Sequence, residues 1–290
     1  MKYPFSLQFQ QFVTLLILFV FGKSFANIHL GWIEAVMILL FAGVVEHLFL
    51  YLRHGVMEYW SYSALSTAIG VMLMVATPHS WIYGVMIVLG LAQKHFLRVR
   101  GHHFFNPSNF ALMIGMVLFY DQAHIVLGQL GDASWLRGVV ILLAALILVR
   151  VDRWRIAVVF VISYLACEYL WVVGYDPVVT FRDVYERFYY VSFVIFVAFM
   201  LTDPRTTPSR GWHQVVFGVV LAVLASWMDR LYGIRAQHLF MVLFLLSPMV
   251  PLIEHRGGKI GWMSITLTLL ALGVIIYLEY QPPYHFEMEG

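Results

Sequence analysis

The sequence predicts an all-α polytopic membrane protein, and its composition and apolar runs support that prediction. Of the 290 residues, 61% are hydrophobic and only 12% are charged, whereas an average soluble domain is about 45–50% apolar and about 25% charged. A bilayer span takes about 17–25 residues. By that measure about 10 or 11 apolar runs cross a membrane, or nearly so. They are residues 8–26, 32–52, 62–76, 80–97, 107–120, 135–150, 155–174, 188–202, 212–228, 237–253 and 260–280.

Two polar, proline-containing breaks interrupt these runs. The first, GHHFFNPSNF, covers Gly101–Phe110, and the second, LTDPRTTPSRG, covers Leu201–Gly211. The runs beside them, 62–76, 107–120 and 188–202, are short for full spans. Irregular backbone at membrane depth is tolerated only where it is buried in protein or lines a cavity. Interruptions in corresponding halves of a membrane protein therefore predict a central ligand site.

Each break contains an Asx residue directly before a proline. Proline fits the first turn of a helix, and the Asx side chain can cap amides that the helix leaves free. We expect Asn106 and Asp203, with Thr202 and Thr206, to face one cavity and hold its ligand. The alternative is that Asn106 and Asp203 only cap helices.

The breaks also fit an internal repeat. Thr77 begins a Thr-Pro turn with Arg100 following 23 residues later, and Thr207 begins another with Arg230 at the same distance. We expect a first five-helix repeat at 1–130, a second and inverted repeat at 131–256, and an additional C-terminal helix and tail at 257–290. Chance similarity between loops of similar composition is the alternative.

Basic residues predict the orientation, because Lys and Arg favour the cytoplasmic side. With eleven spans, twelve basic residues fall on the side of the N-terminus and six on the other. The six are Lys23, Arg137, Arg182, Arg187, Arg230 and Arg235. We expect a multi-pass protein of the cytoplasmic (inner) membrane, with the N-terminus and both breaks inside and the C-terminus outside.

Several ionisable residues lie within the predicted spans. Glu46 and Lys94 lie at similar depth and could form an ion pair, either beside the ligand or with a purely structural role; alternatively, the lysine snorkels to the interface. His47 and His95 could ligate a b-type haem, but one such pair without further in-helix histidines argues against it. The lone Cys167 excludes an internal disulfide, and no cluster has metal-ligand spacing.

Polar residues near the first break complete the candidate site. Ser63, Ser66 and Thr67 share one face of a short helix, where they either line the cavity or allow close helix packing. His102 and His103 fit polar lining or backbone partners better than metal ligands. No nucleotide-binding motif is present, and no basic cluster suggests nucleic acid.

The run KHFLRVRGHHFFNPSNFAL, Lys94–Leu112, resembles the signature of the membrane subunits RnfD and NqrB. These belong to the Rnf ferredoxin:NAD complex and to the sodium-translocating NADH:quinone oxidoreductase. The segments SALSTAIGVML, FMLTDPRTTPSRGW and SPMVPLIE resemble further parts of that family, so that the resemblance covers about residues 32–255.

The resemblance implies ten helices in two inverted repeats of the urea-channel type, flavin binding, and electron transfer coupled to ion movement. With the polar breaks, it gives one set of candidate cofactor-binding residues. They are Ser63, Ser66, Thr67, Lys94, His103, Phe105, Asn106, Pro107, Ser108, Thr202, Asp203 and Thr206.

The chain also departs from the family pattern. Family members attach FMN covalently to a threonine in the loop between helices five and six, but the corresponding segment Tyr120–Gly138 contains no threonine. Arg98 and Val99 replace a Gly-Gly of the family. We therefore expect a shortened, divergent relative that binds FMN or riboflavin without a covalent bond.

Three functions fit these observations. The favoured one is a membrane electron-transfer protein, a candidate subunit of an oxidoreductase, that passes electrons between a non-covalent flavin and quinone or a redox partner subunit. The alternative is a transporter or channel for a small solute, such as a flavin, because fold does not fix function. The third is a non-catalytic subunit that anchors a redox assembly. The only further partner that the sequence predicts is the membrane lipid.

Overall fold

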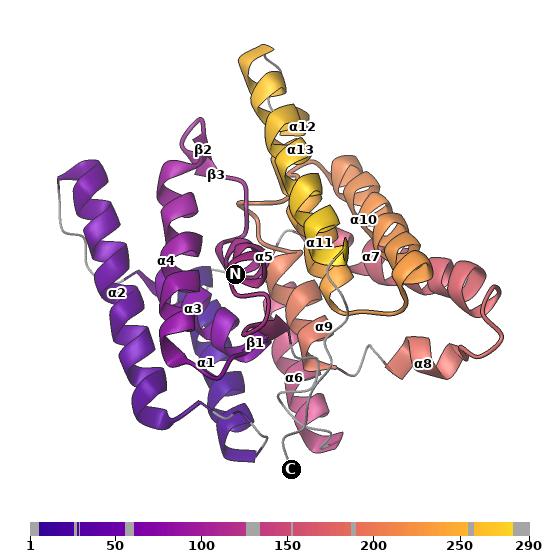
Figure 1. Cartoon of the computed structure of the whole chain (residues 1–290), viewed down its shortest axis with the longest axis horizontal. Helices are drawn as coiled ribbons and strands as arrows, with labels where there is room; N and C mark the ends of the chain where they lie inside the picture. The colour runs from indigo at the N-terminus through magenta and orange to yellow at the C-terminus, as the bar shows by residue number, and fades with distance from the viewer. Residues whose placement is uncertain are drawn as a thin grey trace.

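The computed structural model describes residues 6–25, 28, 30–55, 61–125, 134–151, 153–186, 190–254 and 258–280 (Figure 1). The predicted C-terminal tail, 281–290, lies outside the described residues, as do residues 126–133 of the loop between the predicted repeats.

The first half of the chain consists of five helices joined by short loops. They are α1 (Leu7–Phe25), α2 (Trp32–His54), α3 (Tyr62–Met74), α4 (Ser80–Phe96) and α5 (Pro107–Leu118). Four two-residue strands form two small antiparallel pairs at the loops. They are β1 (Val75–Ala76) with β4 (His124–Ile125), and β2 (Arg98–Val99) with β3 (His102–His103).

The second half contains helices of more varied geometry. They are α6 (Ser134–Leu148), α7 (Trp154–Cys167) continued by the π-helix η1 (Glu168–Val173), α8 (Phe181–Glu186), α9 (Val191–Ile195) continued by the π-helix η3 (Phe196–Met200), α10 (Gly211–Tyr232), α11 (Gln237–Leu246), η4 (Ser247–Met249), α12 (Val250–Glu254) and α13 (Gly258–Tyr280).

These helices confirm the predicted fold class. Each predicted apolar run coincides with a helix or a continuous helical segment, and six described helices are long and apolar enough to cross a membrane. The runs at 62–76 and 107–120 form short helices, as expected beside the first break. The six-residue α8 was not predicted. It begins after Thr180, whose amide donates to the Asp183 carboxylate, which is one half of a capping box, and whose hydroxyl donates to the same oxygen.

Helix packing follows a similar order in the two halves of the chain (Figure 1). In the first, α1 packs on α3, α2 on α4, and α4 on α5; in the second, α6 packs on α9 and η3, α7 on α10, and α10 on α11. Contacts of α5 with α11 and of α1 with α6 join the halves. The division into inverted repeats stays a prediction, which this order of packing supports.

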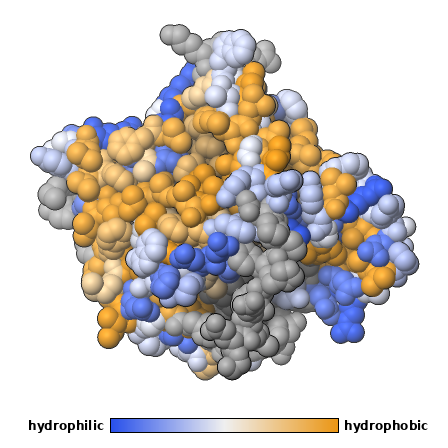
Figure 2. Space-filling view, viewed as in Figure 1, coloured by the Kyte–Doolittle hydropathy of each residue, from blue (hydrophilic) through white to orange (hydrophobic). Residues whose placement is uncertain are grey.

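The surface suits a lipid environment. Figure 2 shows hydrophobic residues over much of the visible face. The helices α2 and α13 expose large apolar side chains, including Ile33 and Val44 on α2 and Trp262 and Leu269 on α13. Contiguous apolar surface on this scale is rare on soluble monomers. In a multi-pass protein it is the surface that the acyl chains contact.

Candidate functional site

The first break folds into a hairpin followed by a capped helix. Strands β2 and β3 pair with Arg98 opposite His103, and the turn between them has positive φ angles at Arg100 (48°) and Gly101 (84°). Glycine adopts this region freely, whereas arginine does so at a cost. The hairpin leaves His102 exposed and buries His103. The Arg98-Val99 pair that replaces the family's Gly-Gly therefore forms a strand.

Asn106 both caps α5 and contacts the second break. Its Oδ1 atom accepts from the amides of Ser108 at 3.1 Å and Asn109 at 3.2 Å, while Pro107 occupies the first helical turn. Its Nδ2 atom donates to Oδ2 of Asp203 at 3.3 Å. Asn106 thus caps α5 and also joins the two breaks, whereas ligand binding by this side chain stays a prediction.

Asp203 organises the second break. Its Oδ1 atom accepts from the amide of Arg205 at 3.0 Å, and its carbonyl accepts from the hydroxyl of Thr207 at 2.7 Å. Burial raises the pKa of the Asp203 carboxyl, and the hydrogen bonds from the Arg205 amide and from Asn106, together with the positive charge of Arg205, oppose that rise. The loop thereby holds the Asp203 side chain against Asn106 of the first break.

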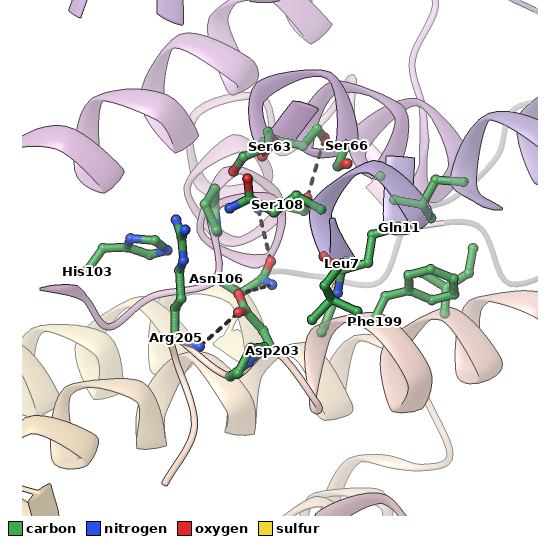
Figure 3. A pocket seen from close by; sticks show the side chains of 18 of the residues that line it. Leu7, Gln11, Ser63, Ser66, His103, Asn106, Ser108, Phe199, Asp203 and Arg205 are labelled. Atoms are coloured by element: carbon green, nitrogen blue, oxygen red, sulfur yellow. Dashed lines mark hydrogen bonds between the residues drawn. The ribbon is translucent and has the colours of Figure 1, made fainter. Parts of the chain in front are cut away.

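The two breaks meet beside a cavity of about 430 Å³ (Figure 3). Known ligand pockets span about 300–1,000 Å³. One part of the lining is polar and comes from α3, the first break and Asp203. Another part is apolar and comes from α9, η3 and the leucines of α1. The polar residues include Ser63, Ser66, Thr67, His103, Asn106, Ser108 and Asp203, and the apolar ones include Leu7, Leu15, Ile195, Phe199 and Met200.

Eight of the twelve predicted site residues line this cavity, namely Ser63, Ser66, Thr67, His103, Asn106, Pro107, Ser108 and Asp203. The other four lie outside its lining. Lys94 pairs with Glu46, the Phe105 ring stacks on Phe244 with centroids 5.0 Å apart, and Thr202 donates to the carbonyl of Ala198. Thr206 is buried within its own loop.

Sequence reasoning missed the contribution of α1 and of Arg205. Gln8, Gln11 and Leu15 of α1 line the cavity, and so does Arg205. Gln8 and Gln11 are three residues apart, which places them on one face of the helix. Two glutamines on one face of an apolar span are the signal that could have indicated this wall.

Glu46 is the centre of a buried cluster near the cavity. Its Oε1 atom accepts from Nζ of Lys94 at 2.5 Å and from the hydroxyl of Ser61 at 2.9 Å, and its Oε2 atom lies 2.9 Å from Nε2 of His95. This confirms the ion pair between Glu46 and Lys94. Of the two histidines considered for haem, His95 belongs to this cluster, and His47 has its Nδ1 atom 2.6 Å from the carbonyl of Gly43.

A second buried cluster, here named the Asp229 cluster, joins α7, α10, α11 and α13. Asp229 accepts from the hydroxyl of Tyr164 at 2.7 Å and lies 2.6 Å from Nδ1 of His238. Nε2 of His238 lies 3.2 Å from Glu279, which also accepts from Arg235. No sequence pattern predicted this cluster. Among the described residues, no group of three or more His, Cys, Asp and Glu side chains is arranged to hold a metal ion.

The comparison with known families adds the decisive observation. Residues 117–261, half of the chain, match the sequence model of the NQR2, RnfD, RnfE family. The chain belongs to this family. The NQR2, RnfD, RnfE match contains the second break and most of the Asp229 cluster, whereas Asn106 and the rest of α13 lie outside it.

A curated relative supports the same assignment. It is a subunit of the ion-translocating oxidoreductase complex of Escherichia fergusonii, and it is 29% identical over 127 residues, which are 43% of this chain and 33% of that protein. The match thus spans about a third of the relative. Taken with its helices, the NQR2, RnfD, RnfE membership makes the chain a multi-pass membrane protein.

Proposed function

We propose that this chain is a membrane subunit of an oxidoreductase that binds a flavin non-covalently in the central cavity and passes electrons to or from quinone or a partner subunit. The name of the Escherichia relative, an ion-translocating oxidoreductase subunit, supports the class of activity. The single observation that carries the proposal is the meeting of Asn106 and Asp203 at a cavity with one polar and one apolar part.

The lining suits the two edges of an isoalloxazine ring. One edge of that ring is a dimethylbenzene, which fits the apolar residues Leu15, Ile195 and Phe199. The other carries two carbonyls and an N–H, which can exchange hydrogen bonds with Ser66, Asn106 or their polar neighbours. A bound flavin would supply one- and two-electron chemistry, while the protein supplies binding, orientation and electrostatics.

The absence of threonine from Tyr120–Gly138 supports a non-covalent attachment. Denaturing the purified yellow protein should release all flavin into the supernatant. Fluorescence that remains on the polypeptide in a denaturing gel would contradict this part of the proposal.

Alanine substitution tests the site itself. Asn106→Ala and Asp203→Ala should each weaken flavin binding by roughly 10–100-fold, as expected for loss of a buried polar contact. Asn109→Ala is the matched control, because Asn109 is a buried asparagine in the first turn of α5 but donates to the carbonyl of Phe240 and does not line the cavity.

Flavin content is measured per folded protein after gel filtration. Full occupancy in both cavity variants would reduce Asn106 and Asp203 to helix caps and overturn the site. A wild-type protein that stays colourless after incubation with FMN and riboflavin would overturn the redox proposal and favour solute transport.

A further inference from the structure

One end of the cavity carries two side chains that the proposed ring contacts do not use. His103 is 3% exposed, lines the cavity, and its Nδ1 atom is enclosed without a hydrogen-bond partner among the described residues. A buried polar atom without a partner costs free energy. A ligand in the cavity can remove that cost by forming a hydrogen bond with the imidazole.

Arg205 stands beside this histidine. Figure 3 shows its side chain extending along the imidazole of His103, although the two residues come from different breaks. The Arg205 amide donates to Asp203. Its guanidinium, in contrast, is within ion-pair distance of no carboxylate in the part of the chain that the structure describes, and Asp203 acts on it only at longer range. A cation therefore faces the cavity without a counter-charge in direct contact.

The surroundings fix the role of each group. Burial, together with the nearby positive charges of Lys94 and Arg205, lowers the pKa of His103 to about 3. The imidazole is therefore neutral at physiological pH and offers a hydrogen bond, while Arg205 offers charge. Together they match an anionic acceptor, because guanidinium groups form strong, directed hydrogen bonds to such groups.

We infer that His103 and Arg205 form a subsite for a negatively charged group of the bound flavin. This inference rests on the proposed function. Two sources of that charge exist: the phosphate of FMN, which riboflavin lacks, and the isoalloxazine ring, which becomes anionic when the reduced form loses its N1 proton. In either case the positive end of the cavity sets which form of the cofactor is held most tightly.

Arg205→Gln and His103→Phe test the subsite in the purified full chain. Arg210→Gln and His102→Phe are the matched controls, since both residues are exposed and neither lines the cavity. Arg205 is itself exposed, so its replacement should leave the fold intact. The measurements are affinities for FMN and for riboflavin, and the midpoint potential of the bound flavin.

If the phosphate occupies the subsite, Arg205→Gln weakens FMN binding by roughly 10–100-fold and leaves riboflavin binding unchanged. If the reduced ring occupies it, both oxidised flavins bind as before but the reduced form binds about tenfold less tightly. For a two-electron couple that lowers the midpoint potential by about 30 mV.

The inference is overturned if the wild type binds flavin and both variants retain its affinities and its potential. A wild type that binds neither flavin refutes the proposed function, and the subsite falls with it. The controls should match the wild type in every measurement.

Discussion

Removing the carboxylate of Glu46 should destabilise the protein far more than removing the whole ion pair. Glu46 is 2% exposed and Lys94 is 6% exposed. The two carboxylate oxygens of Glu46 lie within hydrogen-bond distance of three polar side chains, those of Ser61, Lys94 and His95. Glu46→Leu therefore leaves a buried ammonium without its counter-charge, and such a change costs about 3–5 kcal/mol.

The double variant Glu46→Leu/Lys94→Met removes both charges and keeps similar volumes. Replacing a buried pair by apolar side chains is often neutral or stabilising, so the double variant should regain most of the lost stability. Glu46→Gln should fall between wild type and Glu46→Leu, because the amide keeps one acceptor oxygen. The free energy of unfolding is measured by denaturant titration in mixed micelles. If Glu46→Leu alone is as stable as the double variant, Lys94 escapes to solvent and the reasoning fails.

Three further predictions concern packing, pH and orientation. Gly90→Ala should lower the free energy of unfolding by about 1–3 kcal/mol, because a Cβ at this position would lie 2.6 Å from the carbonyl oxygen of Pro107. In the control Gly84→Ala the new Cβ would have Phe41 as its nearest neighbour, at 3.5 Å, so this variant should unfold at or slightly above the wild-type denaturant concentration. The pKa of His103 is lowered to about 3 in the folded protein, so that below pH 6.5 the unfolded chain binds more protons than the folded one. Acidification from pH 7 to pH 5 should therefore lower the free energy of unfolding by about 2 kcal/mol, and the His103→Gln variant should not show this loss. Equal pH dependence in the two proteins would refute this. A reporter fused after Gly290 should be active only outside the cytoplasmic membrane, and cytoplasmic activity would remove either one span or the predicted orientation.

The sequence was sufficient to locate the apolar helices, though not the short α8, and the two breaks, because a polar Asn-Pro or Asp-Pro between apolar runs interrupts the hydrophobic pattern sharply. It also predicted that Asn106 and Asp203 would be near each other, since both interruptions occupy corresponding halves. It could not show which neighbours of Asn106 turn toward the cavity. Phe105 is adjacent in sequence but stacks on Phe244, and this choice depends on how α5 meets α11.

The contributions that were missed all depend on contacts between distant segments. Gln11 reaches the cavity only because α1 packs on α3, and Arg205 only because the second break lies against the first. The Asp229 cluster joins residues from four helices, among which the separation between Asp229 and Glu279 is 50 residues along the chain. Periodicity within one helix carries no information about such partners.

The Asp229 cluster also has a consequence for biosynthesis. Glu279 is the penultimate residue of α13, the last helix described, and it faces a histidine that already contacts Asp229. During synthesis, α10 and α11 are therefore translated before the carboxylate that completes their polar cluster. The second half of the protein cannot reach its final balance of buried charge until α13 has been inserted.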